Sequence, residues 1–224
     1  MCGRFVRYTT PMDLAALYEI QDAPVVEASY NIVPTESIVT VRLTPEVHKR
    51  EFALLKWGLV PSWAKDMKIG NKMINARAET VAVKPSFRVA LRKRRCLIIA
   101  DGFYEWQRSV KPSRPHYFKM KDSKPFAIAG IWEHWEDQDK KVVETCAMLT
   151  TSANELMRPV HDRMPVILDP ANYDLWLDRS MQEAEKLAHL CSPFSAEQME
   201  TYEVSTIVNA PKNNDPLCIK PLER

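Results

Sequence analysis

Glycine is scarce in this sequence, with five glycines against sixteen prolines in 224 residues. Such a composition favours stiff, irregular connections over flexible linkers. No glycine-rich loop is present that could cradle a phosphate, and the H-E-x-x-H, G-x-S-x-G and EF-hand motifs are missing too. The sequence therefore predicts neither a metal site nor a nucleotide cofactor.

Long apolar runs are also missing. No run approaches the roughly 18 residues that span a bilayer, and the N-terminal segment lacks the apolar stretch of a signal peptide. We therefore expect no membrane association and a cytoplasmic location. The net charge is only +2, but segment 62–95 carries +8 and the rest of the chain −6. This asymmetry indicates a polyanionic partner, although the run "LRKRR" is equally typical of a solvated surface.

The five cysteines are odd in number, widely scattered and without a C-x-x-C pair, so neither a zinc site nor a disulfide framework is predicted. Cys96 and Cys146 lie in apolar runs and are predicted to be small core residues. Cys2 lies in no such run. Removal of Met1 would leave Cys2 with a free α-amine and a thiol on adjacent carbons, a 1,2-aminothiol that no internal cysteine can offer.

Strands occur in both halves of the chain, with helices inserted between them and no strict alternation. This pattern predicts an α+β fold, a single domain over residues 1–224 with a mostly antiparallel, barrel-like β-sheet and peripheral helices. Thr10 and Asp169, each followed by proline, are predicted to begin helices. The expected helices are 9–20, 169–178 and 180–190, a turn is expected over 44–49, and the expected strands are 37–43, 50–60, 95–106 with a break at 101–102, 115–120, 125–135, 142–151 and 201–206.

The stretch "ADGFYEW" supplies a first candidate for chemistry. In a strand, Phe103 and Glu105 face one side, and Tyr104 and Trp106 the other. Glu105 would then project from a buried segment, where desolvation suits a carboxyl group to proton transfer near neutrality. The alternative is an edge carboxylate paired with an arginine.

Two further stretches carry candidates. In "RPVHDRMPVIL", His161 and Arg163 lie between two prolines that stiffen the turn, and His161 is either a proton shuttle or a structural histidine. In "NKMINARAET", Asn75 and Arg77 share a side if the segment is extended, and Arg77 could clamp a phosphate. Trp63, near Lys65, is either a platform for stacked bases or a core residue.

Seven motifs occur in order along the chain: "MCGRF", "YNIVPT", "WGLVPSW", "INARAET", "ADGFYEW", "VHDRMPVIL" and "VSTIVNAPKNND". In this respect the chain resembles the SOS-response-associated peptidase (SRAP) family, the abasic-site-processing proteins of bacteria and eukaryotes. The resemblance extends from Cys2 to "PLCIKP", essentially the whole chain. It implies a sensor of abasic sites in single-stranded DNA, active as a monomer at damaged DNA of the nucleoid, that shields the lesion through a thiazolidine on Cys2.

The same resemblance implies roles for individual residues. His161 would assist opening of the sugar ring, Glu105 would move protons at the amine and help reverse the link, and Asn75 would orient the lesion. Autoproteolytic removal of Met1 and an abasic-site lyase side activity are implied as well. The DNA contacts implied are Arg4, Arg77 and Arg163 to phosphates, Thr150 lining the site, and Trp63 and Phe87 against bases.

Three classes of function remain open at this level. The first is the covalent crosslinker of abasic DNA, which uses both the terminal cysteine and the basic segment. The second is a cysteine peptidase acting on other proteins, with Cys2 as nucleophile and His161 as base. The third is a single-stranded DNA-binding module without chemistry.

Overall fold

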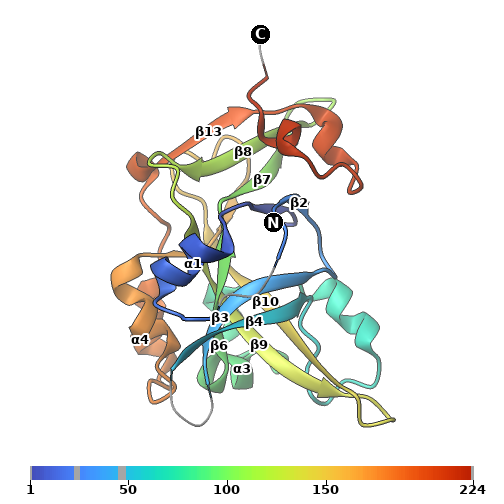
Figure 1. Cartoon of the computed structure of the whole chain (residues 1–224), viewed down its shortest axis with the longest axis vertical. Helices are drawn as coiled ribbons and strands as arrows, with labels where there is room; N and C mark the ends of the chain where they lie inside the picture. The colour runs from blue at the N-terminus through green and yellow to red at the C-terminus, as the bar shows by residue number, and fades with distance from the viewer. Residues whose placement is uncertain (1, 23–25, 45–48, 223–224) are drawn as a thin grey trace.

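Two β-sheets form the framework of the computed structural model, which describes residues 2–22, 26–44 and 49–222 (Figure 1). The smaller sheet, in the upper half of Figure 1, is antiparallel throughout and has the order β13-β8-β7-β1-β2. Its strands are β13 (Met199–Glu203), β8 (Arg114–Met120), β7 (Gly102–Gln107), β1 (Phe5–Arg7) and β2 (Ser29–Ile32).

The larger sheet closes on itself. Its order is β11-β10-β4-β3-β6-β9-β12, and because β10 also pairs with β9, five of these strands form a closed barrel. Only the pairings of β10 with β4 and with β5 are parallel among the described strands. The α+β, mostly antiparallel and barrel-like prediction is confirmed. The strands are β3 (Ser37–Leu43), β4 (Arg50–Trp57), β5 (Asn75–Arg77), β6 (Arg95–Ala100), β9 (Phe126–Glu136), β10 (Val142–Ser152), β11 (Arg163–Pro165) and β12 (Ile167–Leu168).

Short helices lie outside the sheets, with α1 (Pro11–Tyr18) and α4 (Tyr173–Leu177) on one side of the barrel (Figure 1). Thr10 begins α1 as predicted, because its hydroxyl accepts from the Asp13 backbone N–H at 3.2 Å. Tyr18 and Tyr173 stack with ring centroids 5.7 Å apart and join the two helices. The other helices are α2 (Ala78–Val81), α3 (Arg88–Lys93) and α5 (Ala184–Ala188), and 3₁₀ turns span Met67–Lys72, Pro170–Asn172, His189–Cys191, Ala196–Gln198, Thr206–Asn209 and Pro216–Ile219.

The predicted elements correspond to the observed ones with a few differences. The strand predicted over 95–106 is indeed broken at Asp101, between β6 and β7. The helix predicted over 180–190 is shorter, since only Ala184–Ala188 is α-helical. Strands β1, β2, β5 and β11 were not predicted, and neither were α2 and α3, because each has three to six residues. The turn predicted over 44–49 lies largely outside the described residues.

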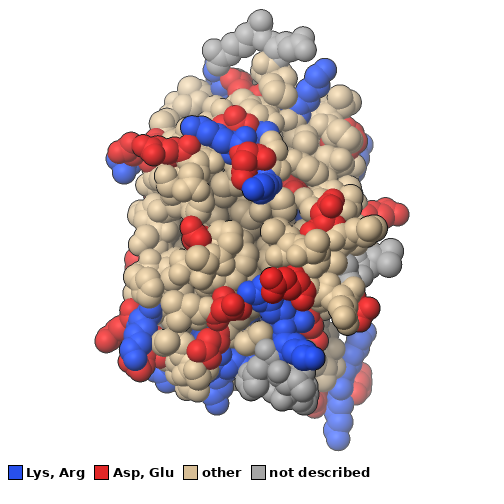
Figure 2. All heavy atoms as spheres, turned by 60° about the vertical axis from the view of Figure 1, so that its left-hand side comes forward, with Lys and Arg blue, Asp and Glu red and all other residues tan. Residues whose placement is uncertain are grey.

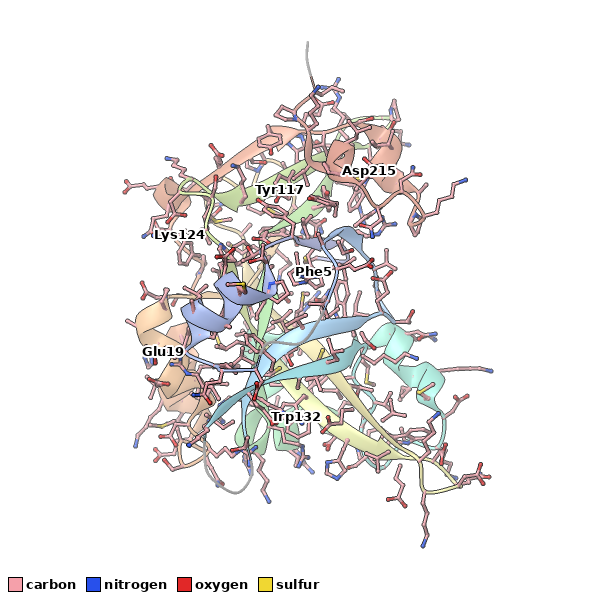
Figure 3. The ribbon with its side chains drawn as sticks, in the orientation of Figure 1. Phe5, Glu19, Tyr117, Lys124, Trp132 and Asp215 are labelled. Carbon is pink, nitrogen blue, oxygen red and sulfur yellow. The ribbon has the colours of Figure 1, made fainter. Side chains whose placement is uncertain are left out.

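The region between the two sheets is an apolar cluster that contains Cys2. Phe5 lies there, as Figure 3 shows, and packs edge-on against Trp57 at a centroid distance of 5.3 Å. Cys96 and Cys146 are fully buried, which confirms their prediction as core residues. Within the described ranges, no helix is long and apolar enough to cross a membrane.

Candidate active site around Cys2

Cys2 lies three residues before the start of β1, and a hydrogen bond to its backbone holds it in place. Its carbonyl oxygen accepts a hydrogen bond from Asn75 Nδ2 at 2.8 Å. Its thiol lies 3.6 Å from the carbonyl oxygen of Arg4, and the residue is only 1% exposed. Strand β1 then pairs with β7 through Phe5 and Phe103, so the segment that follows Cys2 is held against β7.

Asn75 is held in turn by a parallel strand pairing. Strand β5 lies along β10 with Asn75 opposite Met148, and the preceding carbonyl, of Ile74, accepts from the Trp57 indole at 2.9 Å. The amide oxygen of Asn75 is buried and has no hydrogen-bond partner among the described residues. That oxygen is an acceptor available to a ligand bound beside Cys2.

Glu105 acts on Cys2 through its charge. As predicted, β7 alternates: Phe103 packs in the cluster that contains Cys2, whereas Tyr104 packs in a separate tyrosine cluster. Glu105 is 2% exposed on the Phe103 side of the strand. Burial, and secondly the negative charge of Glu105, raise the pKa of the Cys2 thiol to about 12. The thiol is therefore protonated at neutral pH in this arrangement.

His161 lies in the loop between β10 and β11. Its Nδ1 accepts from the Arg163 backbone N–H at 3.0 Å, so in the neutral ring the proton is on Nε2. The Asp162 carboxylate also lies 3.0 Å from Nδ1, but its side chain is 88% exposed, so water screens that contact. Gln107, two residues beyond Glu105, donates to the Pro159 carbonyl at 3.3 Å and connects this loop to β7.

Arg163, Thr150 and Arg77 meet where β5, β10 and β11 adjoin. The Arg163 guanidinium donates to the Thr150 carbonyl at 2.6 Å, and Arg77 is opposite Thr150 in the β5–β10 register. Both Arg163 terminal nitrogens also donate to the Glu79 carboxylate, at 2.5 and 2.9 Å. These hydrogen bonds from Arg163 are the main cause that lowers the pKa of Glu79. Arg77 itself is exposed.

Arg4 connects the N-terminal segment to the C-terminal one. Its guanidinium donates to the Asn31 side chain and to the Val208 carbonyl, both at 2.7 Å, and to the Asn209 carbonyl at 3.3 Å. It also lies 5.8 Å from the Trp106 ring centroid. Arg4 therefore connects the segment before β1 to β2 and to the 3₁₀ turn Thr206–Asn209.

The two aromatic residues proposed to contact bases differ in exposure. Trp63 is 60% exposed and presents its ring to solvent. Phe87 is 8% exposed and belongs to the apolar cluster that includes Ala90 and Leu91 of α3. In this structure Phe87 is therefore a core residue.

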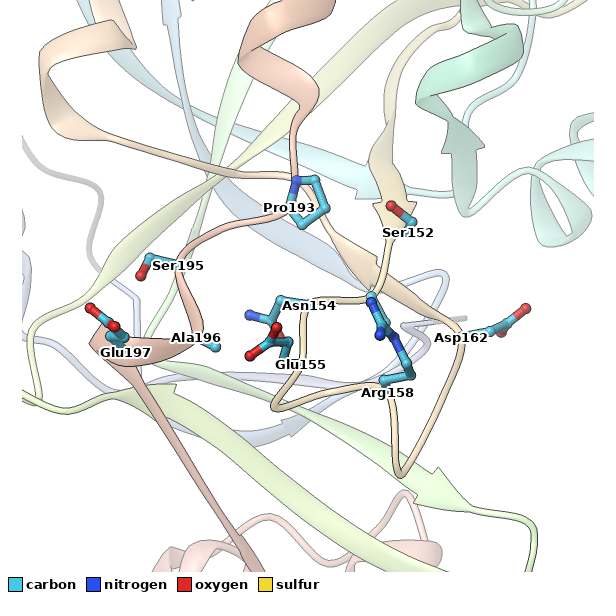
Figure 4. A pocket seen from close by; sticks show the side chains of 10 residues that line it. Ser152, Asn154, Glu155, Arg158, Asp162, Pro193, Ser195, Ala196 and Glu197 are labelled. Carbon is cyan, nitrogen blue, oxygen red and sulfur yellow. The ribbon is translucent and has the colours of Figure 1, made fainter.

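A pocket of about 620 Å³ adjoins the loop that carries His161 (Figure 4). Arg158 and Asp162 of that loop lie on one side of the pocket, and Ser195 and Glu197 lie on the other.

On the face shown in Figure 2, basic side chains lie among acidic ones rather than in one block of positive charge. Among the described residues, no cluster of histidine, cysteine and acidic side chains is suited to a metal ion.

The family model for the SOS response associated peptidase, SRAP, matches residues 1–211. The chain belongs to the SRAP family. It is 45% identical to the abasic site processing protein YoqW of Bacillus subtilis, over 98% of this chain and 99% of that one. It is 33% identical to the abasic site processing protein HMCES of Gallus gallus, over 75% of this chain and 57% of that one. A crystal structure of a protein from Bacteroides thetaiotaomicron has a TM-score of 0.89 at 28% identity, covering 99% of this chain and 100% of that one.

In this SRAP protein, the residues singled out from the sequence fall into distinct groups. Asn75 and Glu105 adjoin Cys2, and Thr150, Arg163 and Arg77 adjoin one another. Sequence reasoning missed Glu79, which pairs with Arg163 across 84 positions of the chain. Its only signal was its place in the motif "INARAET", two residues after Arg77.

Proposed function

We propose that this SRAP protein captures abasic sites in single-stranded DNA by covalent attachment to Cys2, acting as a monomer. After removal of Met1, which lies outside the described residues, the α-amine of Cys2 attacks the aldehyde of the ring-opened sugar. Water leaves and a Schiff base forms. The sulfur then bonds to the same carbon while its proton passes to the nitrogen, which closes a five-membered thiazolidine ring.

One observation carries the proposal: Cys2 is held by Asn75 through its own backbone, beside a buried carboxylate. Because the Cys2 carbonyl accepts this hydrogen bond, the contact with Asn75 occupies neither the amine nor the thiol of Cys2. Preorganisation of this kind removes much of the entropic cost of bringing two reactants together. The relatives YoqW and HMCES are abasic site processing proteins by name, which agrees with this substrate class.

Proton transfers are assigned to two residues. The buried carboxylate of Glu105 accepts a proton from the attacking amine and returns it when the link is reversed. The His161 ring, with its proton on Nε2, donates to the sugar oxygen as the ring opens, which favours the aldehyde form. A thiol whose pKa is about 12 reacts as a neutral group, so the amine attacks first and the sulfur closes the ring.

DNA contacts are assigned to exposed groups around these residues. Arg77 binds a phosphate beside the lesion, and Arg163, already oriented by Glu79 and Thr150, supports the same strand. Trp63 stacks on a neighbouring base. The protonated Schiff base also permits β-elimination, which accounts for a lyase side activity, and exposure of Cys2 by loss of Met1 accounts for the peptidase in the family name.

A denaturing gel tests the proposal. Mixed with a single-stranded oligonucleotide that carries one abasic site, the protein should give a heat-stable covalent band. Cys2→Ala keeps a terminal amine but loses the ring-closing sulfur, so its band should require borohydride trapping. An intact oligonucleotide, which lacks an aldehyde, is the control. A protein peptidase predicts no band, and a passive binder predicts a shift on a native gel that denaturation abolishes.

A further inference from the structure

A histidine lies directly beside Glu105 in the smaller sheet. In the register of the antiparallel strands, Glu105 of β7 is opposite His116 of β8, and His116 is opposite Glu203 of β13. Residues directly opposite in antiparallel strands have Cβ atoms about 4.5–5.5 Å apart and side chains on one face. The three side chains therefore form one row across the sheet, with the imidazole between two carboxylates.

The row begins in the buried site and ends near solvent. Glu105 is 2% exposed, His116 is half-buried with both ring nitrogens shielded from solvent, and the Glu203 side chain is 17% exposed. The neighbours along the strands on the same face are Phe103 and Phe118, which stack at 5.2 Å, and the His116 ring lies 6.5 Å from Phe118. This apolar flank lowers the local polarity and strengthens charge interactions within the row.

The charged and titratable groups facing this row come from four elements. Cys2, in the segment before β1, is close enough to Glu105 for that carboxylate to raise the pKa of its thiol, and Glu203 of β13 is opposite His116. Arg114 of β8 lies 3.7 Å from Glu203 and balances that carboxylate. The loop that carries His161 reaches β7 through Gln107. His116 is thus the cation-forming group placed opposite Glu105 in the strand register.

We propose that His116 is a positioning residue that keeps Glu105 ionised and so able to accept a proton from the Cys2 amine. This inference rests on the proposed function in one respect, the role of Glu105 as acceptor of a proton from the Cys2 amine. Carboxylates on both sides favour the imidazolium form of His116, and an imidazolium within about 4–6 Å stabilises a carboxylate. A neutral residue in place of His116 would remove this stabilisation of the Glu105 carboxylate.

The test measures Glu105 directly, without DNA. In protein labelled with ¹³C at glutamate carboxyl carbons, the Glu105 signal is assigned by its loss in Glu105→Gln, and its titration is followed from pH 3 to 8. In His116→Gln the midpoint should move upward by about 1 pH unit. His116→Lys, which keeps a positive charge, should restore a midpoint near that of the wild type. His134→Gln is the matched control, because His134 lies 3.6 Å from Glu133 outside this site and should not move the Glu105 midpoint.

Crosslinking kinetics connect the titration to the reaction. At pH 5.5, His116→Gln should crosslink an abasic single strand more slowly than the wild type, by at most about tenfold for a shift of about 1 pH unit. At pH 8 the two rates should agree within about twofold. In a Glu105→Gln background the same change should have no pH-dependent effect. An unchanged Glu105 midpoint in His116→Gln would overturn the inference, whether or not the wild type crosslinks. Absence of wild-type crosslinking with a shifted midpoint would instead overturn the proposed function alone.

Discussion

Asn75→Ala is the substitution that most directly tests the arrangement around Cys2. It removes the 2.8 Å hydrogen bond to the Cys2 carbonyl and leaves that carbonyl buried, because Cys2 is only 1% exposed. An unsatisfied buried acceptor costs about 1–3 kcal/mol. If this cost appears as lost preorganisation of the aminothiol, each 1.36 kcal/mol is a tenfold change in rate. Crosslinking should then be about 5- to 150-fold slower.

Single-turnover kinetics with excess protein over a single-stranded abasic oligonucleotide measure this rate, and guanidinium denaturation measures the free energy of unfolding. Thr40→Val is the matched control. It removes a similar hydrogen bond, from the buried Thr40 hydroxyl to the Ala53 carbonyl at 3.0 Å, within the β3–β4 pair of the barrel. Thr40→Val should lower the free energy of unfolding by about as much as Asn75→Ala does, and it should leave the crosslinking rate unchanged. Wild-type crosslinking by Asn75→Ala, or equal slowing in both variants, would refute the reasoning.

Three further predictions concern the thiol, the DNA surface and the barrel. Burial and Glu105 raise the pKa of the Cys2 thiol to about 12, so its alkylation by iodoacetamide at pH 8 should be at least about 100-fold slower than in the denatured protein. The alkylation rate should increase up to pH 12. Equal rates in the folded and denatured protein, measured by mass spectrometry, would contradict this prediction. Arg77→Ala should weaken binding to single-stranded DNA and reduce the slope of log affinity against log salt by about 1; an unchanged slope would assign Arg77 to structure. Gly130→Ala should cost about 1–3 kcal/mol in guanidinium unfolding, since its Cβ would lie 2.8 Å from the Cys96 sulfur; wild-type stability would show that the barrel wall adapts.

Local patterns determined much of this protein. The alternation in "GFYEW" placed Glu105 on the same side as Phe103, and the structure confirms it. Thr10 followed by proline began a helix, and the break at Asp101 separated two strands. Each of these features depends on neighbours within about four residues, through side-chain direction, capping or turn formation. Such short-range physics is readable before any tertiary contact is known.

The site itself depended on contacts between distant parts of the chain. Strands β1 and β5 have three residues each, too few for a recognisable period, and they exist because β7 and β10 offer paired backbone edges. The Arg163–Glu79 pair follows from the same assembly.

The sequence indicated Cys2, Asn75 and Glu105 as candidate site residues, but it did not show which of them lie close together in the folded protein. The same basic segment offered both Trp63 and Phe87, and folding exposed the first and buried the second. His116 carried no sequence signal, since its meaning comes from the residue that strand pairing sets opposite it. Strand register is a property of two segments at once, and burial is a property of the whole chain, so neither can be read from one stretch alone.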